Sequence, residues 1–179
     1  MKRNKARGTL TIVVGLPGSG KSHLIEELTR KATGLVRDDF MAGIEYSPLI
    51  WRLPTVTDSA VYPRLISDLR SGKQCVISDI IFCDTLIRLE IENAVRRDVP
   101  KVDLRWEFFE NNPTACKANA RRRARKKSLS KELKLITFLS RKYILPEEAT
   151  AHKVWVEKTS KKRTTRGKKP ARTSTRRKK

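Results

Sequence analysis

The sequence of 179 residues predicts one α/β domain, a three-layer α/β/α sandwich around a five-stranded parallel sheet. Short apolar segments rich in β-branched residues alternate along the chain with amphipathic helical segments. This order is typical of parallel sheets whose strands are joined by helical crossovers. Hydrophobic residues make up 38% of the chain, enough for one core. No apolar run reaches the roughly 20 residues of a membrane-spanning helix, so no membrane segment is expected.

The expected strands are short and apolar. The first covers 9–14, reads Thr-Leu-Thr-Ile-Val-Val, and leads into a glycine-rich turn. The other four strands are expected at 35–37, 74–78, 103–109 and 153–157. Residues 40–62 contain two prolines and follow no regular period, so an irregular connection is expected there.

The expected helices start and end at residues that favour helix termini. The first is expected at 21–32 and ends near Gly34, and the second at 63–71, between Pro63 and Gly72. The third is expected at 85–97 with Asp84 as its cap, and its apolar residues are Leu86, Leu89, Ile91 and Val95. A basic helix begins at Asn112 and Pro113, and a last helix is expected at 131–143 with Ser130 as its cap.

Residues 15–22 read Gly-Leu-Pro-Gly-Ser-Gly-Lys-Ser and match the phosphate-binding pattern G-x-x-x-x-G-K-[ST]. The expected strand before them and helix after them make a chance glycine-rich turn a poor explanation. Glycines let the backbone wrap around phosphate oxygens, and the helix N-terminus supplies positive potential. Lys21 would bridge the β- and γ-phosphates of ATP, and the Ser22 hydroxyl would ligate Mg²⁺. The residues expected to bind the nucleotide are Gly15, Pro17, Gly18, Ser19, Gly20, Lys21 and Ser22.

Acidic residues follow two of the expected strands. Asp38 and Asp39 come directly after the second strand, and Asp79 ends the third. The carboxyl ends of parallel strands gather at one edge of the sheet, where the phosphate-binding loop also lies. A carboxylate there can take the proton of an acceptor hydroxyl, or hold Mg²⁺ directly or through water. Adjacent side chains point differently, so at most one of Asp38 and Asp39 would be the base. The alternative is that these acids cap helices or turns.

The net charge of +22 is unevenly distributed. Residues 159–179 hold eleven Lys and Arg, no acid and no large apolar residue, which predicts a disordered basic tail. We therefore divide the chain into a basic extension at 1–8, a domain at 9–158 and the tail. A second basic cluster runs from Arg121 to Lys127. Because Lys and Arg neutralise phosphate charges, we expect the tail and this cluster to bind nucleic acid. The alternative is that these charges only keep the protein soluble.

The cysteines and histidines predict no metal centre of their own. Cys75, Cys83 and Cys116 form no C-x-x-C pair, and His23 and His152 are isolated. This pattern argues against a zinc site, and it favours a reducing, cytoplasmic location.

Three segments together resemble a known family. The loop 15–22, then Val-Arg-Asp-Asp-Phe at 36–40, then Val-Ile-Ser-Asp at 76–79 resemble the P-loop kinases related to bacteriophage-type 5′-polynucleotide kinase, with the zeta-toxin-like kinases as close relatives. Asn-Ala-Arg-Arg at 119–122 stands where that family has its arginine-bearing lid helix. The resemblance implies that Lys21 and Ser22 bind ATP and Mg²⁺ and that Asp38 accepts the acceptor's proton. It also implies that Asp79 occupies the Mg²⁺ or water position, and that Arg122 is the lid arginine.

Two departures leave the acceptor open. Met41 stands where polynucleotide kinases place an arginine, and Ile80-Ile81 replaces a common Thr-Asn pair. Residues 40–58 would form the acceptor pocket, in which Phe40, Tyr46 and Trp51 either stack on a base or simply pack.

The sequence thus predicts an ATP-dependent phosphotransferase that moves the γ-phosphate to a hydroxyl, with a nucleic-acid 5′-hydroxyl as one candidate acceptor. The alternatives are a kinase for a small metabolite or nucleotide sugar, and a nucleic-acid-binding ATPase. A GTPase is not expected, because the chain has no Asn-Lys-x-Asp guanine signature.

Overall fold

The computed structural model describes residues 7–42, 55–123 and 129–156, and its centre is a five-stranded, all-parallel sheet in the order β2-β3-β1-β4-β5. The strands are β1 (Thr9–Val14), β2 (Val36–Arg37), β3 (Gln74–Ser78), β4 (Asp103–Phe109) and β5 (Ala151–His152). The register pairs Val13 with Ser78 of β3 and Val14 with Phe108 of β4. The three longest strands therefore end together, and the loop after β1 lies at that common carboxyl edge.

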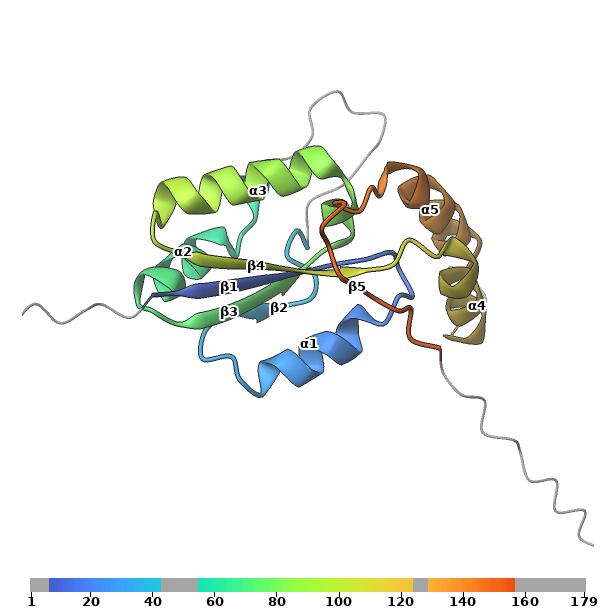
Figure 1. Ribbon diagram of the computed structural model, residues 1–179, viewed down its shortest axis with the longest axis horizontal. Helices are drawn as coiled ribbons and strands as arrows, with labels where there is room; N and C mark the ends of the chain where they lie inside the picture. The colour runs from blue at the N-terminus through green and yellow to red at the C-terminus, as the bar shows by residue number, and fades with distance from the viewer. Residues whose placement is uncertain (1–6, 43–54, 124–128, 157–179) are drawn as a thin grey trace, which may run out of the picture.

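Helices cover both faces of the sheet, as the predicted three-layer fold requires (Figure 1). The five α-helices of the described residues are α1 (Lys21–Thr29), α2 (Tyr62–Arg70), α3 (Thr85–Asp98), α4 (Pro113–Arg123) and α5 (Leu129–Lys142); two 3₁₀ turns are η1 (Val56–Asp58) and η2 (Ile80–Cys83). Helix α1 lies on one face and α2 and α3 on the other, while α4 and α5 pack together at the carboxyl edge.

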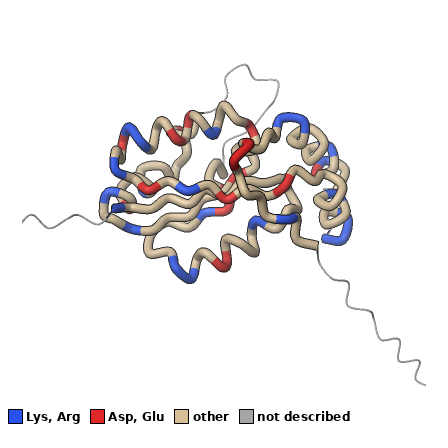
Figure 2. The backbone as a smooth tube through the Cα atoms, in the orientation of Figure 1, with Lys and Arg blue, Asp and Glu red and all other residues tan. Residues whose placement is uncertain are grey.

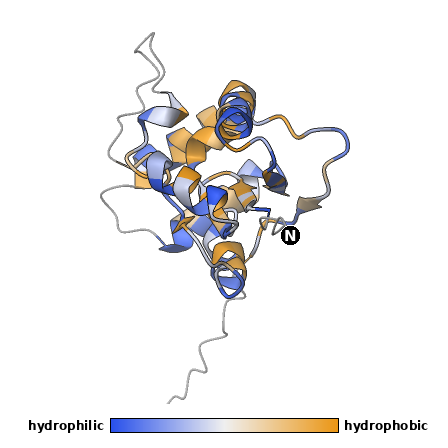
Figure 3. Cartoon of the chain, turned by 90° about the vertical axis from the view of Figure 1, so that its left-hand side faces the viewer, coloured by the Kyte–Doolittle hydropathy of each residue, from blue (hydrophilic) through white to orange (hydrophobic). Residues whose placement is uncertain are grey.

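The core fills both spaces between sheet and helices. On the α1 side, Val13 and Val76 pack with Ile25. The larger cluster, on the α2 and α3 side, includes Leu10 and Ile12, both 0% exposed. Along the helices, apolar and polar residues alternate in the way expected when one face packs and the other meets water (Figure 3). Because β1 contributes apolar side chains to both faces, it is the central strand of the domain.

Three expected helices differ in detail in the structure. Helix α1 ends at Thr29, three residues early, and α5 begins at Leu129, so Ser130 lies inside the helix and is not its cap. On α3, Leu86 and Leu89 face solvent at 68% and 53% exposure, and the core contacts come from the helix's other apolar residues. The Asp84 cap is confirmed, because its side chain accepts a hydrogen bond from the Leu86 N–H.

The last strand is the largest correction. We expected it at 153–157, but β5 pairs Ala151 and His152 with the end of β4. Beyond His152 the backbone leaves the sheet, because other groups take its N–H donors: Val154 donates to the Glu110 carboxylate at 3.0 Å, and Trp155 donates to the Ser19 carbonyl at 2.9 Å. Residues 153–156, here named the C-terminal strap, therefore cross the loop after β1.

Several expectations fall outside the described residues: most of the extension 1–8, the tail 159–179, Tyr46 and Trp51, and residues 124–128 of the basic cluster. Phe40 is described, and it is only 1% exposed and packs 6.1 Å from the Phe82 ring, so it belongs to the core. In the described part of the chain, no helix has the length and apolar character that crossing a membrane requires.

Candidate active site

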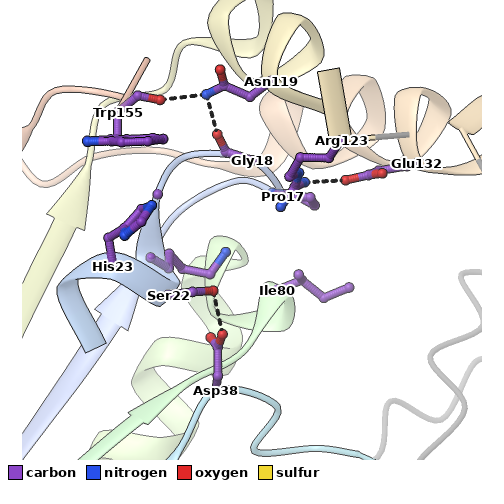
Figure 4. Close-up of a pocket in the computed structure, with 12 residues that line it drawn as sticks. Pro17, Gly18, Ser22, His23, Asp38, Ile80, Asn119, Arg123, Glu132 and Trp155 are labelled. Atoms are coloured by element: carbon purple, nitrogen blue, oxygen red, sulfur yellow. Dashed lines mark hydrogen bonds and ion pairs between the residues drawn. The ribbon is translucent and has the colours of Figure 1, made fainter. Parts of the chain in front are cut away.

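A cavity of about 370 Å³ opens at the carboxyl edge of the sheet (Figure 4). Its walls come from the loop 15–22, here named the phosphate loop, and from α1, the end of β2, η2, α4, α5 and the C-terminal strap. The lining residues are Pro17, Gly18, Gly20, Lys21, Ser22, His23, Asp38, Ile80, Asn119, Arg123, Glu132 and Trp155. Of the seven residues predicted to bind nucleotide, Gly15 and Ser19 are not in this lining. Ser19 is 0% exposed, beneath the loop surface.

Two glycines of the phosphate loop adopt backbone conformations that other residues avoid. Gly18 has φ +84° and Gly20 has φ +108°. A Cβ on Gly18 would lie 2.7 Å from the Cys116 carbonyl oxygen of α4, and one on Gly20 would lie 2.7 Å from the Trp155 Cβ. The loop is therefore held closely between α4 and the C-terminal strap, and side chains at these two positions would push those elements apart.

Lys21 opens α1 and is 9% exposed. Its Nζ donates to the Gly15 carbonyl at 2.8 Å and to the Leu16 carbonyl at 3.2 Å. Burial lowers the pKa of Lys21, because the charged form loses its hydration. The first turn of α1 has no side-chain cap, so its N–H groups and Lys21 together favour an anion in the cavity.

Asp38 enters the cavity and Asp39 does not. The Ser22 hydroxyl donates to Asp38 Oδ2 at 2.8 Å, across from the end of β2 (Figure 4). Asp39 turns away and pairs with the Arg37 guanidinium at 2.7 Å. Of the two adjacent acids, only Asp38 lines the cavity.

Asp79 lies behind the cavity, where its carboxylate accepts backbone hydrogen bonds from Met41 at 2.8 Å and Ile81 at 3.2 Å. Burial raises the pKa of Asp79, although those hydrogen bonds and Lys21 favour its charged form. Asp79 is absent from the lining, and its contacts fix the chain after β2 to the end of β3.

The oxygen atoms of Ser22 and Asp38 suit Mg²⁺, which prefers hard oxygen ligands and keeps several waters. They lie within hydrogen-bond distance of each other beside the phosphate loop. No group of three or more His, Cys, Asp and Glu in the described residues could hold a metal by itself. A metal held by Ser22 and Asp38 would therefore need further ligands, such as phosphate oxygens and water.

Helix α4 contributes Asn119 and Arg123. Asn119 donates from Nδ2 to the Gly18 carbonyl at 2.9 Å and to the Trp155 carbonyl at 2.6 Å, so one side chain joins helix, loop and strap (Figure 4). Arg123 lines the cavity and pairs with Glu132 of α5 at 2.7 Å. Arg122, the arginine expected from the resemblance, is exposed and absent from the lining, and its role as lid arginine stays a prediction.

Two aromatic residues, Trp155 and His23, also line the cavity, and the sequence had not pointed to Trp155 as a site residue. The Trp155 and His23 rings lie 4.3 Å apart, and Trp155 remains 46% exposed (Figure 4). The alternating segment around Trp155 predicted a strand, and nothing in that pattern pointed to the phosphate loop.

Comparison with known proteins gives a family and two similar proteins. The model of the AAA_33 family, described as an AAA domain, matches residues 10–142. The uncharacterized protein R277 of Acanthamoeba polyphaga mimivirus is 28% identical over 116 residues, which is 64% of this chain and 72% of that protein. A solved structure, of the Pnkp1/Rnl/Hen1 RNA repair complex, aligns with a TM-score of 0.47 and 15% identity; the match covers 89% of this chain and 52% of that one.

Proposed function

The chain belongs to the AAA_33 family and carries its P-loop fold, and from this premise we propose that it is an ATP-dependent phosphotransferase acting on a hydroxyl, with a nucleic-acid 5′-hydroxyl as the leading acceptor. The observation that carries the proposal is the position of Asp38. Its carboxylate lies in the same cavity as Lys21 and is hydrogen-bonded to Ser22. A carboxylate at this position can take the proton of an acceptor hydroxyl that attacks the γ-phosphate.

In the proposed complex, ATP phosphates lie in the phosphate loop, and Lys21 exchanges its two carbonyl partners for phosphate oxygens. This exchange is favourable, because a buried ammonium gains a charged partner in place of neutral ones. The base of ATP would stack on the exposed Trp155 ring beside His23. Base–aromatic stacking contributes about 1–3 kcal/mol.

The Ser22 hydroxyl would ligate Mg²⁺ together with phosphate oxygens and water, and the bound ion would neutralise charge on the β- and γ-phosphates. In the transfer, the acceptor oxygen attacks the γ-phosphorus, its proton passes to the Asp38 carboxylate, the bond to the bridging oxygen breaks, and ADP leaves. Arg123 would leave Glu132 and bind the equatorial oxygens, where negative charge spreads in the transition state. The role expected of Asp79 becomes the indirect one of fixing the chain after Asp38.

The test is transfer of phosphate from γ-labelled ATP to a panel of 5′-hydroxyl oligonucleotides, nucleosides and sugars. Asp38→Asn should reduce transfer about 10²-fold or more and leave ATP affinity nearly unchanged, because the amide keeps the shape but cannot take the proton. Asp39→Asn is the matched control and should stay within about threefold of wild type on the same scale, since Asp39 lies outside the cavity.

The panel also separates the alternatives. Transfer to a sugar or nucleoside without transfer to oligonucleotides would identify a small-metabolite or nucleotide-sugar kinase. Release of inorganic phosphate alone, stimulated by nucleic acid, would identify a nucleic-acid-binding ATPase. If Asp39→Asn loses transfer while Asp38→Asn retains it, the assignment of the base is wrong.

A further inference from the structure

Between the extension 1–8 and the tail 159–179, the positive charge of the sequence is concentrated in one segment. Residues 113–142, here named the basic hairpin, contain α4 and α5 and carry eleven Lys and Arg against a single acid, Glu132. When this hairpin, the extension 1–8 and the tail 159–179 are all left out, the remaining residues have a net charge of −3. Lys and Arg accordingly gather around α4 and α5 in Figure 2. A strong, localised positive potential of this kind favours a polyanionic partner.

A second hollow, of about 460 Å³, lies between the two helices of the basic hairpin. Lys117 and Arg121 line it from α4, and Ser130, Lys134 and Thr137 line it from α5, together with two leucines of α5. We name this hollow the basic groove. It shares no lining residue with the cavity at the phosphate loop.

The two hollows lie on opposite faces of α4. Successive helical residues are 100° apart, so Lys117 and Arg121 share one face, and Asn119 and Arg123 share the face opposite. The second pair lines the cavity, and the first pair lines the basic groove. A ligand in the groove would therefore leave the nucleotide cavity open.

The cations of the groove lack acidic partners within the described residues. The one acid of the basic hairpin, Glu132, pairs with Arg123 on the cavity side. No described carboxylate forms an ion pair with Lys117, Arg121 or Lys134. Like charges four residues apart on a helix destabilise it by a few tenths of a kcal/mol. An anion bound between them would remove this repulsion.

We propose that the basic groove binds the phosphodiester backbone of the nucleic acid that serves as acceptor; this inference rests on the proposed function for the acceptor's identity. Cations and hydroxyls are the groups that contact phosphate oxygens in nucleic-acid complexes. The groove has no aromatic lining, so it would contact the backbone and would not read bases.

The experiment compares two triple variants of the full chain with wild type. The groove variant combines Lys117→Gln, Arg121→Gln and Lys134→Gln. The control variant combines Arg30→Gln, Lys31→Gln and Lys101→Gln, which remove the same charge from exposed residues outside both hollows. Binding of 3′-labelled single-stranded DNA and RNA of about 20 nucleotides is followed by fluorescence anisotropy between about 50 and 200 mM salt.

The groove variant should reduce the slope of log Kobs against log salt by about 2–3, because each lost phosphate contact accounts for about 0.7–0.9. The control variant should change that slope by less than about 1. In transfer assays, the KM for a 5′-hydroxyl oligonucleotide should rise in the groove variant with kcat unchanged. Both variants should retain wild-type ATP affinity, since none of the six residues lines the nucleotide cavity.

The two failures are distinguishable. If wild type binds oligonucleotide and the groove variant loses the binding, but no oligonucleotide accepts phosphate, the groove stands and the acceptor assignment fails. Equal losses in the groove and control variants would show that binding is diffuse, and would overturn the groove. Absence of oligonucleotide binding by wild type would overturn it as well.

Discussion

Asn119 offers the sharpest test of how the site is held together. Its Nδ2 donates to two carbonyls on separate segments, Gly18 of the phosphate loop and Trp155 of the C-terminal strap. Its Oδ1 is buried and has no hydrogen-bond partner. The side chain is 7% exposed, so both carbonyls depend on this amide. Two substitutions, Asn119→Ala and Asn119→Asp, should therefore have different costs.

The cost of Asn119→Ala follows from its hydrogen bonds. Losing two neutral hydrogen bonds costs about 1–3 kcal/mol, and removing the buried unpaired Oδ1 returns about 1 kcal/mol, which leaves a net loss of about 1 kcal/mol. Asn119→Asp instead points carboxylate oxygens at two carbonyl oxygens. An uncompensated buried charge costs about 3–5 kcal/mol. A chain of this size loses about 2–4 °C in Tm per kcal/mol, so we expect losses of about 2–4 °C for Ala and at least 6 °C for Asp.

Thermal unfolding and ATP titration together give the assay. Because Gly18 lies in the phosphate loop, about 1 kcal/mol of lost support should raise the Kd for ATP about fivefold in Asn119→Ala. Asn111 is a matched control, because its Nδ2 also donates to two carbonyls, those of Ser140 and Tyr143, and its Oδ1 is also buried and unpaired. Asn111→Ala should lower Tm by a similar amount and leave ATP affinity unchanged. The reasoning fails if Asn119→Asp is no less stable than Asn119→Ala, or if Asn119→Ala binds ATP as wild type does.

Three further predictions concern single residues. Lys21→Ala should lower kcat/KM for ATP turnover by about 10²-fold or more, because the γ-phosphate loses its buried cation during transfer; a loss below about threefold in steady-state kinetics would contradict the assignment. Arg88→Met should lower the free energy of unfolding in urea by about 3 kcal/mol or more, because charge-assisted hydrogen bonds are worth about 1.5–3 kcal/mol each. The Arg88 guanidinium is 6% exposed and donates to the carbonyls of Phe82, Cys83 and Ile144. A midpoint equal to that of wild type would show that water replaces those contacts. Burial raises the pKa of the Cys75 and Cys116 thiols to about 11 and that of the Cys83 thiol to about 12. A thiol reagent at neutral pH should therefore label the native protein slowly, and it should label all three thiols after denaturation.

The sequence alone determined the layers of the fold and the chemistry of the phosphate loop. Alternating apolar segments predicted a parallel sheet with helical crossovers, and Gly18, Gly20, Lys21 and Ser22 were recognisable from their spacing. Such patterns are readable because they encode local backbone geometry, such as a left-handed turn or a helix start, within a few residues. Asp38 and Asp39 could be placed at the carboxyl edge of the sheet in the same way, because they directly follow a strand, but only the family resemblance favoured Asp38 over Asp39.

Only the tertiary structure decided which distant residues complete the site. Asn119 contacts Gly18 across a separation of 101 residues, and Trp155 reaches Ser19 after leaving the sheet. The short β5 strand, the outward Leu86 and the choice of Arg123 for the cavity also depend on packing. Periodicity places a residue on a face of its own helix or strand, but the partner of that face depends on how the elements pack. That packing is a balance of burial and hydrogen bonding over the whole domain, and no short segment of the chain records it.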